Sequence, residues 1–417
     1  MHMSRSSLLI MVALALLGLS CGKKRRANEQ KLIRQGKGFL QRGKRERGIQ
    51  ALKQAFNLNP DNVDTTIVLA KALLENSDPR NASIALSTHL SKNKGSAYLW
   101  YLLGLSRYQE RKSDAAIESL DEALKRKRAY PQAILLLGKI YEEHKELVAA
   151  KEAYLSVADN MALGKELTPI LVKLARIELS SDKEQERANG VAHLLAALKL
   201  DPSSRDAHSA LGLQYLKDKK PKRAIELFTS WIKHNPKDGM GHLHLGQALL
   251  MDTQYEKAIA QYEKAALLRP QDTLPLMGIA EVAAIIKKPE RVYSALVKAS
   301  ALQPKNMGVK WRLIPFHMER ERFEVALKSL LAVKGVYGTR PDYYALLTDA
   351  YFGLGEYASA YESHMKRLSL GASPTDAFNR RAGILARQAG YYPKAVEYLR
   401  PVEPRTSRTQ KGGAHSP

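Results

Sequence analysis

The chain has 417 residues, of which 45% are hydrophobic and only 7% aromatic, and its formal net charge is +24. It contains one cysteine, Cys21, which excludes a zinc site built from several cysteines. A chain of this length ordinarily has two or three domains, but no long stretch shows the alternation of apolar and polar residues that is typical of a strand. The composition therefore gives no indication of a β-sheet and fits a helical protein.

Residues 1–20 have the pattern of a signal peptide. Ser4-Arg5 precedes an apolar run of twelve residues, from Leu8 to Leu19. A helix needs about 20 apolar residues to span a bilayer, so this run is too short for a membrane span and matches the core of a secretory signal instead. We expect no other segment to cross a membrane.

The segment Leu17-Gly18-Leu19-Ser20-Cys21 resembles a bacterial lipobox. The resemblance implies that Cys21 becomes the first residue after cleavage and carries lipid, palmitate included, which leaves no thiolate for catalysis. Several lipid chains make membrane binding durable. Gly22 is not the aspartate that retains lipoproteins in the inner membrane of enteric bacteria, so the resemblance implies an outer-membrane lipoprotein facing the periplasm, with the inner membrane as the alternative. A plain signal peptide or an uncleaved anchor with an incidental cysteine remains open.

The segment after Cys21 is strongly basic. Residues 23–47 contain eleven lysines and arginines against two glutamates. Residues 21–28 are therefore interpreted as a lipidated basic linker, in which the cations nearest the membrane are Lys23, Lys24, Arg25 and Arg26. Basic residues beside an anchor are attracted to anionic lipid by up to about 1 kcal/mol each. A solvated basic linker explains the charge equally well. A nucleic-acid partner is not expected, because no RNA-binding motif accompanies the charge.

A period of 34 residues runs through the rest of the chain. It separates Pro202, Pro236, Pro270 and Pro304, and it also separates pairs of glycines and alanines such as Gly212 and Gly246. A period of this length indicates one supersecondary unit that is copied along the chain. Two independent sets of spacings place about six extra residues in the middle of the array, near 161–168 and 181–186.

The segment Gly239–Asp272 is the most regular copy. Its apolar residues recur at three- or four-residue spacing on two helices, and Pro270 ends the second helix. The small residues Gly246 and Ala258 are expected to face each other and to let the helix axes approach closely, while Leu245 and Tyr262 fill the gaps. In the copy before it, Trp231 stands where the repeat usually has alanine. We predict that Trp231 packs over Gly241, because glycine provides the space.

The pattern resembles the tetratricopeptide repeat, for example in Trp100-x-x-Leu103-Gly104 with Ala116, Leu120 and Ala123. Eleven copies are expected over 29–402, starting near 29, 63, 97, 131, 168, 205, 239, 273, 307, 341 and 376. The resemblance implies an all-α, right-handed superhelical solenoid of antiparallel helix pairs, in which first helices line the concave face. Gly48, Pro315 and Thr348 depart from the pattern.

Residues 403–417 contain no large apolar residue, so we expect a disordered tail.

Nothing in the sequence has the pattern of a catalytic, metal or cofactor site, so the protein is expected not to be an enzyme. His242 and His244 are two residues apart, which places their rings about 200° apart on a helix rather than on one face. Metal-binding pairs on helices use a spacing of four residues. His242 is therefore expected to pack within its repeat.

The concave face is the expected protein-binding groove, because first-helix positions that point away from the partner helix are aromatic, aliphatic or methionine. The predicted groove residues are Tyr98, Tyr101, Leu105, Leu213, Met240, Leu243, Met277 and Trp311. Such a surface suits a peptide or an amphipathic helix. The alternative is that some of these residues merely pack between adjacent first helices. Ile33 and Lys37 occupy the positions where chaperone-binding relatives have a Lys and Asn clamp, so that partner class is not expected.

These features together predict a lipid-anchored, non-enzymatic scaffold that binds other proteins and in which a homo-oligomer is possible. The chain resembles tetratricopeptide lipoproteins of type IV pilus and secretin assembly. A scaffold for exopolysaccharide export and an adaptor of peptidoglycan enzymes are the alternatives. At the C-terminal end, Val396 and Leu399 are expected to be uncovered, either as a docking face or as the frayed end of a marginal repeat.

Overall fold

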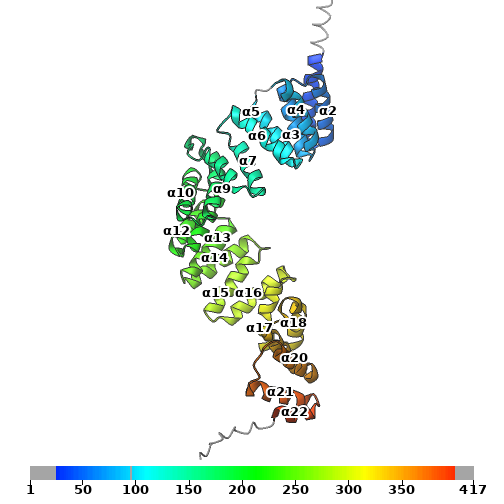
Figure 1. Cartoon of the computed structure of the whole chain (residues 1–417), viewed down its shortest axis with the longest axis vertical. Helices are drawn as coiled ribbons and strands as arrows, with labels where there is room; N and C mark the ends of the chain where they lie inside the picture. Colours follow the sequence, from blue (N-terminus) through cyan, green and yellow to red (C-terminus); the bar gives the residue numbers. More distant parts are fainter. Residues whose placement is uncertain (1–24, 94–95, 400–417) are drawn as a thin grey trace, which may run out of the picture. The chain divides into compact units, whose positions relative to one another are not determined.

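The computed structural model describes residues 25–93 and 96–399 (Figure 1). The predicted signal peptide, Cys21, Lys23, Lys24 and the tail 403–417 lie outside the described residues. The described chain is all-α, and in each unit its helices follow one another as antiparallel hairpins. It divides into two compact units, residues 1–218 and 219–417, and each unit is described by itself.

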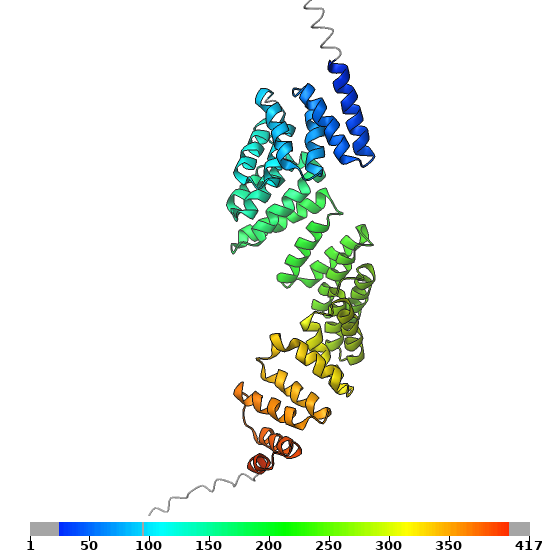
Figure 2. The ribbon, with the colours of Figure 1, turned by 90° about the vertical axis from the view of Figure 1, so that its right-hand side faces the viewer.

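In the first unit a helix over residues 25–41 precedes a row of helices, most of which pack against their neighbours in sequence (Figure 2). The row comprises α2 (Arg45–Leu58), α3 (Val63–Glu75), α4 (Pro79–Lys92), α5 (Ala97–Gln109), α6 (Ser113–Arg126), α7 (Pro131–Glu143), α8 (Leu147–Leu155), the 3₁₀ helix η1 (Met161–Leu167), α9 (Thr168–Leu179), α10 (Glu184–Leu200) and α11 (Arg205–Lys217). Contacts between neighbours in sequence are the expected property of a repeat array.

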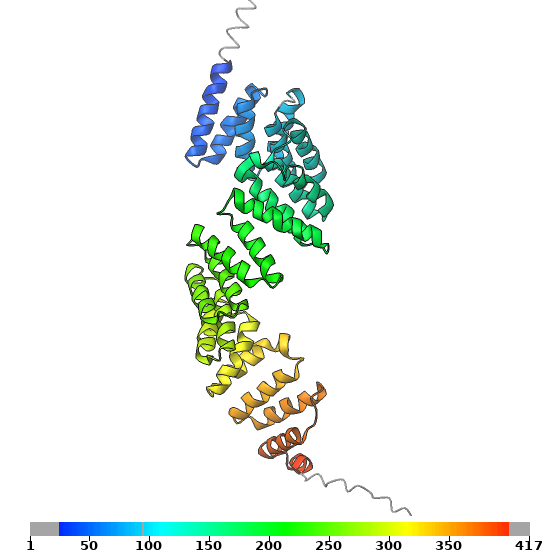
Figure 3. The same cartoon turned by 90° about the vertical axis from the view of Figure 1, so that its left-hand side faces the viewer.

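The second unit repeats this arrangement (Figure 3). It comprises α12 (Pro221–His234), α13 (Gly239–Met251), α14 (Tyr255–Leu268), α15 (Leu274–Ile285), α16 (Pro289–Leu302), α17 (Met307–Glu319), α18 (Phe323–Tyr337), α19 (Pro341–Gly353), α20 (Tyr357–Ser369), α21 (Asp376–Gln388) and α22 (Tyr392–Leu399).

Local signals begin the helices at regular intervals. Six first helices start after a side chain that accepts a hydrogen bond from a backbone N–H of the first turn: Asn62, Ser96, Ser204, Asp238, Asn306 and Thr375. Such caps satisfy donors that a helix end leaves without an intrahelical acceptor. Several second helices begin instead with a proline at the first helical position, as at Pro79 and Pro289, where the missing N–H costs nothing.

In nine of the hairpins, one residue of the turn has positive φ. These residues are Gly43, Ser77, Arg111, Lys145, Thr253, Lys287, Glu321, Gly355 and Gly390. The backbone N–H of the following residue then donates a hydrogen bond to a carbonyl of the first helix. Asp78 donates to Leu73 at 2.8 Å, and Lys288 donates to Ala283 at 2.8 Å. This left-handed C-cap turns the chain sharply, so the second helix folds back on the first.

The extra residues in the middle of the array lie where the two sets of spacings place them. From Pro131 to Thr168 and from Thr168 to Arg205, first-helix starts are 37 residues apart rather than 34. The first three extra residues contribute to η1, in which Gly164 has φ 55°, and the others belong to the α9–α10 hairpin, whose second helix has 17 residues. The repeat therefore absorbs insertions in a turn and in one long helix.

In several hairpins the two helices meet at a glycine. A Cβ added to Gly246 would lie 2.6 Å from the ring of Tyr262, and one added to Gly104 would lie 2.8 Å from Leu120. Tyr262 is 2% exposed and Leu245 is 7% exposed. The expected packing of Tyr262 against Gly246 is thus confirmed, and Leu245 is buried as expected.

The three departures from the pattern are accommodated in different ways. Gly48 faces Leu40, and an added Cβ would lie 2.8 Å from that side chain. Pro315 removes one backbone donor, yet α17 continues to Glu319. The buried Thr348 donates its hydroxyl to the Tyr344 carbonyl at 2.7 Å.

At the C-terminal end of the described chain, α22 leaves apolar side chains on the surface. Val396 is 55% exposed and Leu399 is 41% exposed, although Leu399 also lies against Gly383. Tyr391 packs edge-on against Tyr361 at 5.6 Å between ring centroids. Docking and fraying remain the two predictions for this end.

Candidate protein-binding surface

A strip of tyrosines on α5 is the main feature of the first unit. Tyr98 and Tyr101 stack with ring centroids 6.3 Å apart, and Tyr101 packs against Tyr130, just before α7, at 5.3 Å. Leu105 and Tyr108 continue the strip along α5, and all four α5 side chains are half-buried. The strip therefore combines anchored rings with surface that a partner can contact.

Cations from the neighbouring segments lie against these rings. The Nζ of Lys71 on α3 is 5.2 Å from the centre of Tyr98, and that of Lys139 on α7 is 5.0 Å from the centre of Tyr108. Lys127 lies 5.0 Å from the ring centre of Tyr130. Such contacts are attractive because the face of an aromatic ring is electronegative. The resulting α5 surface, defined as Lys71, Tyr98, Tyr101, Leu105, Tyr108 and Lys139, is apolar with a lysine at each end. Of the two lysines, Lys139 also lies 3.8 Å from a carboxylate oxygen of Glu143.

The hydroxyls of Tyr101 and Tyr130 stay protonated over the physiological range. Burial, with a smaller effect of Tyr98, raises the pKa of Tyr101, and burial with the neighbouring tyrosines raises the pKa of Tyr130 further. Tyr108 donates its hydroxyl to Glu143 at 2.7 Å, which joins α5 to α7. The surface therefore offers ring faces, hydroxyls and ammonium groups, with the carboxylate of Glu143 beside Tyr108.

The sequence prediction found the aromatic part of this surface but not its cations. Lys71 and Lys139 are 68 residues apart, which is two periods, and they share a repeat position with Leu105. A comparison of neighbouring repeats at that position would have identified them. Tyr130 was missed because it lies in the loop before α7 rather than on a first helix.

Leu213 lies elsewhere in the first unit. It is 43% exposed and lines a cleft of about 440 Å³ between α9 and α11. Arg176 and Lys217 also line this cleft, and Arg176 lies 3.9 Å from Asp206. The structure thus keeps Leu213 at the surface but does not bring it to the α5 strip.

The remaining predicted groove residues belong to the second unit. Met240, Met277 and Trp311 are half-buried. Leu243 is only 2% exposed, so its assignment to an exposed groove is corrected: it lies in the core. The reason is that α12 and α15 pack against α13 in addition to α14, its hairpin partner. They bury parts of α13 that the hairpin alone would leave exposed.

The two histidines of α13 are both packed inside the second unit. His242 is 6% exposed, with its Nδ1 2.8 Å from Gln261 Oε1. His244 is also 6% exposed, and its ring stacks on Phe228 at 5.4 Å. Burial lowers the pKa of His244, which favours the neutral imidazole. The expectation that His242 packs within its repeat is confirmed.

Within 25–93 and 96–399, no group of three or more histidine, cysteine, aspartate or glutamate side chains could hold a metal ion.

The helix over residues 25–41 presents cations to solvent. Its exposed charged side chains are Arg25, Arg26, Lys31, Arg34 and Lys37. Its one acidic residue, Glu29, is 4% exposed and accepts hydrogen bonds from the side-chain amides of Asn59 at 3.1 Å and Asn62 at 2.5 Å. The exposed face of this helix is therefore exclusively basic. Among the described helices, none is long and apolar enough to cross a membrane.

Models of the tetratricopeptide repeat match residues 39–105, 101–161, 183–238 and 210–273, which together exceed half of the chain. The chain belongs to the tetratricopeptide repeat family. Repeats of this family support a protein-binding scaffold. No curated protein matches the sequence significantly.

Several solved structures are similar to the chain. One is the C-terminal part of a tetratricopeptide repeat protein from Cytophaga hutchinsonii, which is 16% identical over 58% of this chain and 96% of that one, with a TM-score of 0.46. Another is a crystal structure of MamA, 23% identical over 40% of this chain and 94% of that one, with a TM-score of 0.35. Yeast Tom70 is 13% identical over 90% of this chain and 91% of that one, with a TM-score of 0.36.

Proposed function

We propose that this protein is a non-enzymatic scaffold that is anchored by lipid in the bacterial envelope and gathers the proteins of an envelope assembly. The α5 surface is the observation that carries the protein-binding part of the proposal. Its rings are immobilised by stacking and by cations, so binding a partner costs little side-chain entropy. Rigid aromatic side chains are the residues that most often dominate binding energy at protein interfaces.

The sequence up to Cys21 supports the lipid anchor, and the basic face of the helix over residues 25–41 supports an orientation close to anionic lipid. Arg34 and Lys37 lie on that face, and the one acidic side chain of this described helix, Glu29, is buried on the other side. Machinery for type IV pilus or secretin assembly is the first candidate for the assembly, because the chain resembles the tetratricopeptide lipoproteins of that machinery.

Replacing Cys21 with alanine is expected to release the protein from the membrane into the soluble periplasmic fraction. The same replacement is expected to abolish labelling by an alkyne analogue of palmitate, because the acyl chains are the anchor. Membrane fractionation and labelling of intact cells measure both effects. Membrane association that survives the replacement contradicts the lipid anchor but leaves the protein-binding proposal intact.

A photo-crosslinking amino acid at Leu105 is expected to trap a small, reproducible set of envelope proteins in living cells. Ile84 on α4 is the matched control, because it is 54% exposed and aliphatic but lies outside the α5 surface. Crosslinked bands identified by mass spectrometry at position 105 and absent at position 84 support the proposal. Identical bands from both positions contradict a role of the α5 surface.

A further inference from the structure

A cavity of the second unit lies between α15, α16 and α17. It is a cavity of about 680 Å³, which lies within the range of small-ligand and side-chain pockets. Val292 and Leu296 of α16 are buried in its wall, and Trp311 and Phe316 of α17 contribute aromatic surface. The cavity therefore has the size and polarity to hold one large apolar side chain together with its flanking backbone.

The aromatic residues of this cavity are held in place from outside it. The ring of Trp311 stacks on Tyr337 with centroids 4.5 Å apart and planes 7° apart. Phe316 packs on Tyr293 at 5.9 Å, and Tyr293 in turn lies under the guanidinium of Arg320 at 4.1 Å. Because these rings are already ordered, a ligand does not have to immobilise them.

The charged side chains that line the cavity are all positive. Lys287 and Lys288, in the turn between α15 and α16, and Arg312 on α17 all line it, and no carboxylate does. The nearby Glu290 does not offset them, because Arg320 Nη2 donates to both of its carboxylate oxygens at 2.7 Å. A partner with carboxylates beside an apolar side chain complements this arrangement, since it supplies both kinds of contact.

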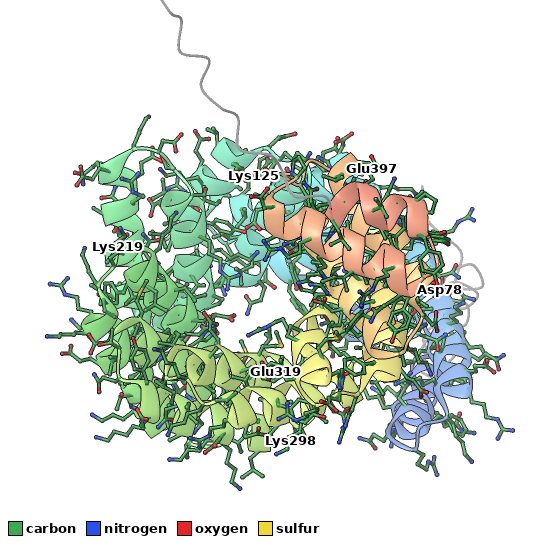
Figure 4. The ribbon with its side chains drawn as sticks, turned by 90° about the horizontal axis from the view of Figure 1, so that it is seen from below. Asp78, Lys125, Lys219, Lys298, Glu319 and Glu397 are labelled. Carbon is green, nitrogen blue, oxygen red and sulfur yellow. The ribbon has the colours of Figure 1, made fainter. Side chains whose placement is uncertain are left out.

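Another cavity of the second unit is lined by charged residues of both signs. It has about 700 Å³ and lies between α14 and α16. Its lining contains Glu263 and Asp272 as well as Arg291 and Lys298, the last of which is labelled in Figure 4. Glu263 and Arg291 form an ion pair at 3.0 Å. Both signs are present, so charge indicates no particular partner there.

We propose that the cavity between α15, α16 and α17 binds an acidic segment of a partner protein. One aromatic or aliphatic side chain of the segment enters between Trp311 and Phe316, and flanking carboxylates lie against Lys287, Lys288 and Arg312. This proposal rests on the function as a protein-binding scaffold and adds the chemistry of a partner. It concerns a surface that is separate from the α5 surface.

The probe is a fluorescein-labelled octapeptide, Ser-Glu-Asp-Leu-Phe-Glu-Asp-Ser, titrated with the full-length protein by fluorescence anisotropy. Two further peptides separate the contributions: one replaces Leu-Phe with Ser-Ser, and the other replaces every acidic residue with lysine. We expect each change to weaken binding at least tenfold, because one removes the side chain that fills the cavity and the other reverses the charge.

Two variants place the binding at the cavity. Lys287→Glu with Lys288→Glu reverses its charge, and Ala284→Tyr fills it from the exposed end of α15. Both are expected to weaken binding of the acidic peptide at least tenfold. Lys264→Glu with Lys328→Glu is the matched control, because it makes the same change in net charge at exposed lysines that do not line the cavity. Circular dichroism verifies that each variant folds.

The proposal is overturned if the control pair weakens binding as much as the Lys287 and Lys288 pair, since attraction to the net positive charge then explains the affinity. It is also overturned if the Ser-Ser peptide binds as tightly as the Leu-Phe peptide, or if Ala284→Tyr has no effect. These outcomes are independent of the crosslinks at Leu105. If the peptide experiments fail but the crosslinks at Leu105 are specific, the acidic-segment site is rejected and the proposed scaffold function is retained.

Discussion

Replacing Trp231 with alanine is expected to lower the free energy of unfolding of the second unit by about 3–5 kcal/mol. Trp231 is fully buried, and its ring packs against Phe228 at 6.2 Å and against His244 at 5.9 Å. A Cβ added to Gly241 would lie 3.4 Å from the same ring, so the predicted packing of Trp231 over Gly241 is confirmed. Removal of the indole leaves a cavity, and α13 has no side chain at Gly241 that could fill it.

Urea unfolding followed by circular dichroism measures this effect, and Leu267→Ala is its control. Leu267 is 81% exposed, so its replacement is expected to change stability by no more than about 0.5 kcal/mol. Adding Gly241→Ala to the Trp231→Ala variant is expected to recover up to about 1 kcal/mol, because alanine is the better helix former and the indole no longer meets the added Cβ. Ile232 Cγ1, 3.2 Å from that Cβ, then has room to shift into the space of the indole. A loss below about 1 kcal/mol for Trp231→Ala contradicts the packing argument.

The architecture could be predicted from the sequence because its determinants are local and repeated. Proline, glycine and alanine at a fixed interval specify where a helix ends and where two helices approach, as at Pro270 and Gly246. The six extra residues could be located because every later repeat inherits the offset. The left-handed turn residues could not be predicted as readily, since at Ser77, Arg111 and Lys287 the position carries no glycine. There the array compensates for an unfavourable backbone conformation.

The candidate surface was predicted less completely because it depends on contacts between repeats. A helical wheel assigns the faces of α13 from its own hairpin, but α12 and α15 cover α13 as well, and Leu243 is therefore buried. The cations beside Tyr98 and Tyr108 come from α3 and α7, so no pattern within α5 could indicate them. Likewise, the cavity beside Trp311 forms only where the turn before α16 meets α17.

Tyr262 leads to the second prediction of a large effect, because its ring lies between two glycines on different helices. A Cβ added to Gly246 on α13 would lie 2.6 Å from the ring, and one added to Gly278 on α15 would lie 2.7 Å from it. Real Cβ contacts essentially never lie this close, and the ring is 2% exposed. Movement away from one glycine drives the ring toward the other, so the usual relaxation of a tight contact is blocked.

Gly278→Val is therefore expected to lower the free energy of unfolding by at least about 1–3 kcal/mol, the usual cost of overpacking. Gly335→Ala is the matched control: it lies within α18, no atom lies within 4 Å of its added Cβ, and it is expected to raise stability by up to about 1 kcal/mol. Urea unfolding measures both. Adding Tyr262→Leu to Gly278→Val is expected to restore part of the loss, because the smaller side chain vacates the space. If Gly278→Val is as harmless as Gly335→Ala, the close contact at Tyr262 does not limit the packing of α13, α14 and α15.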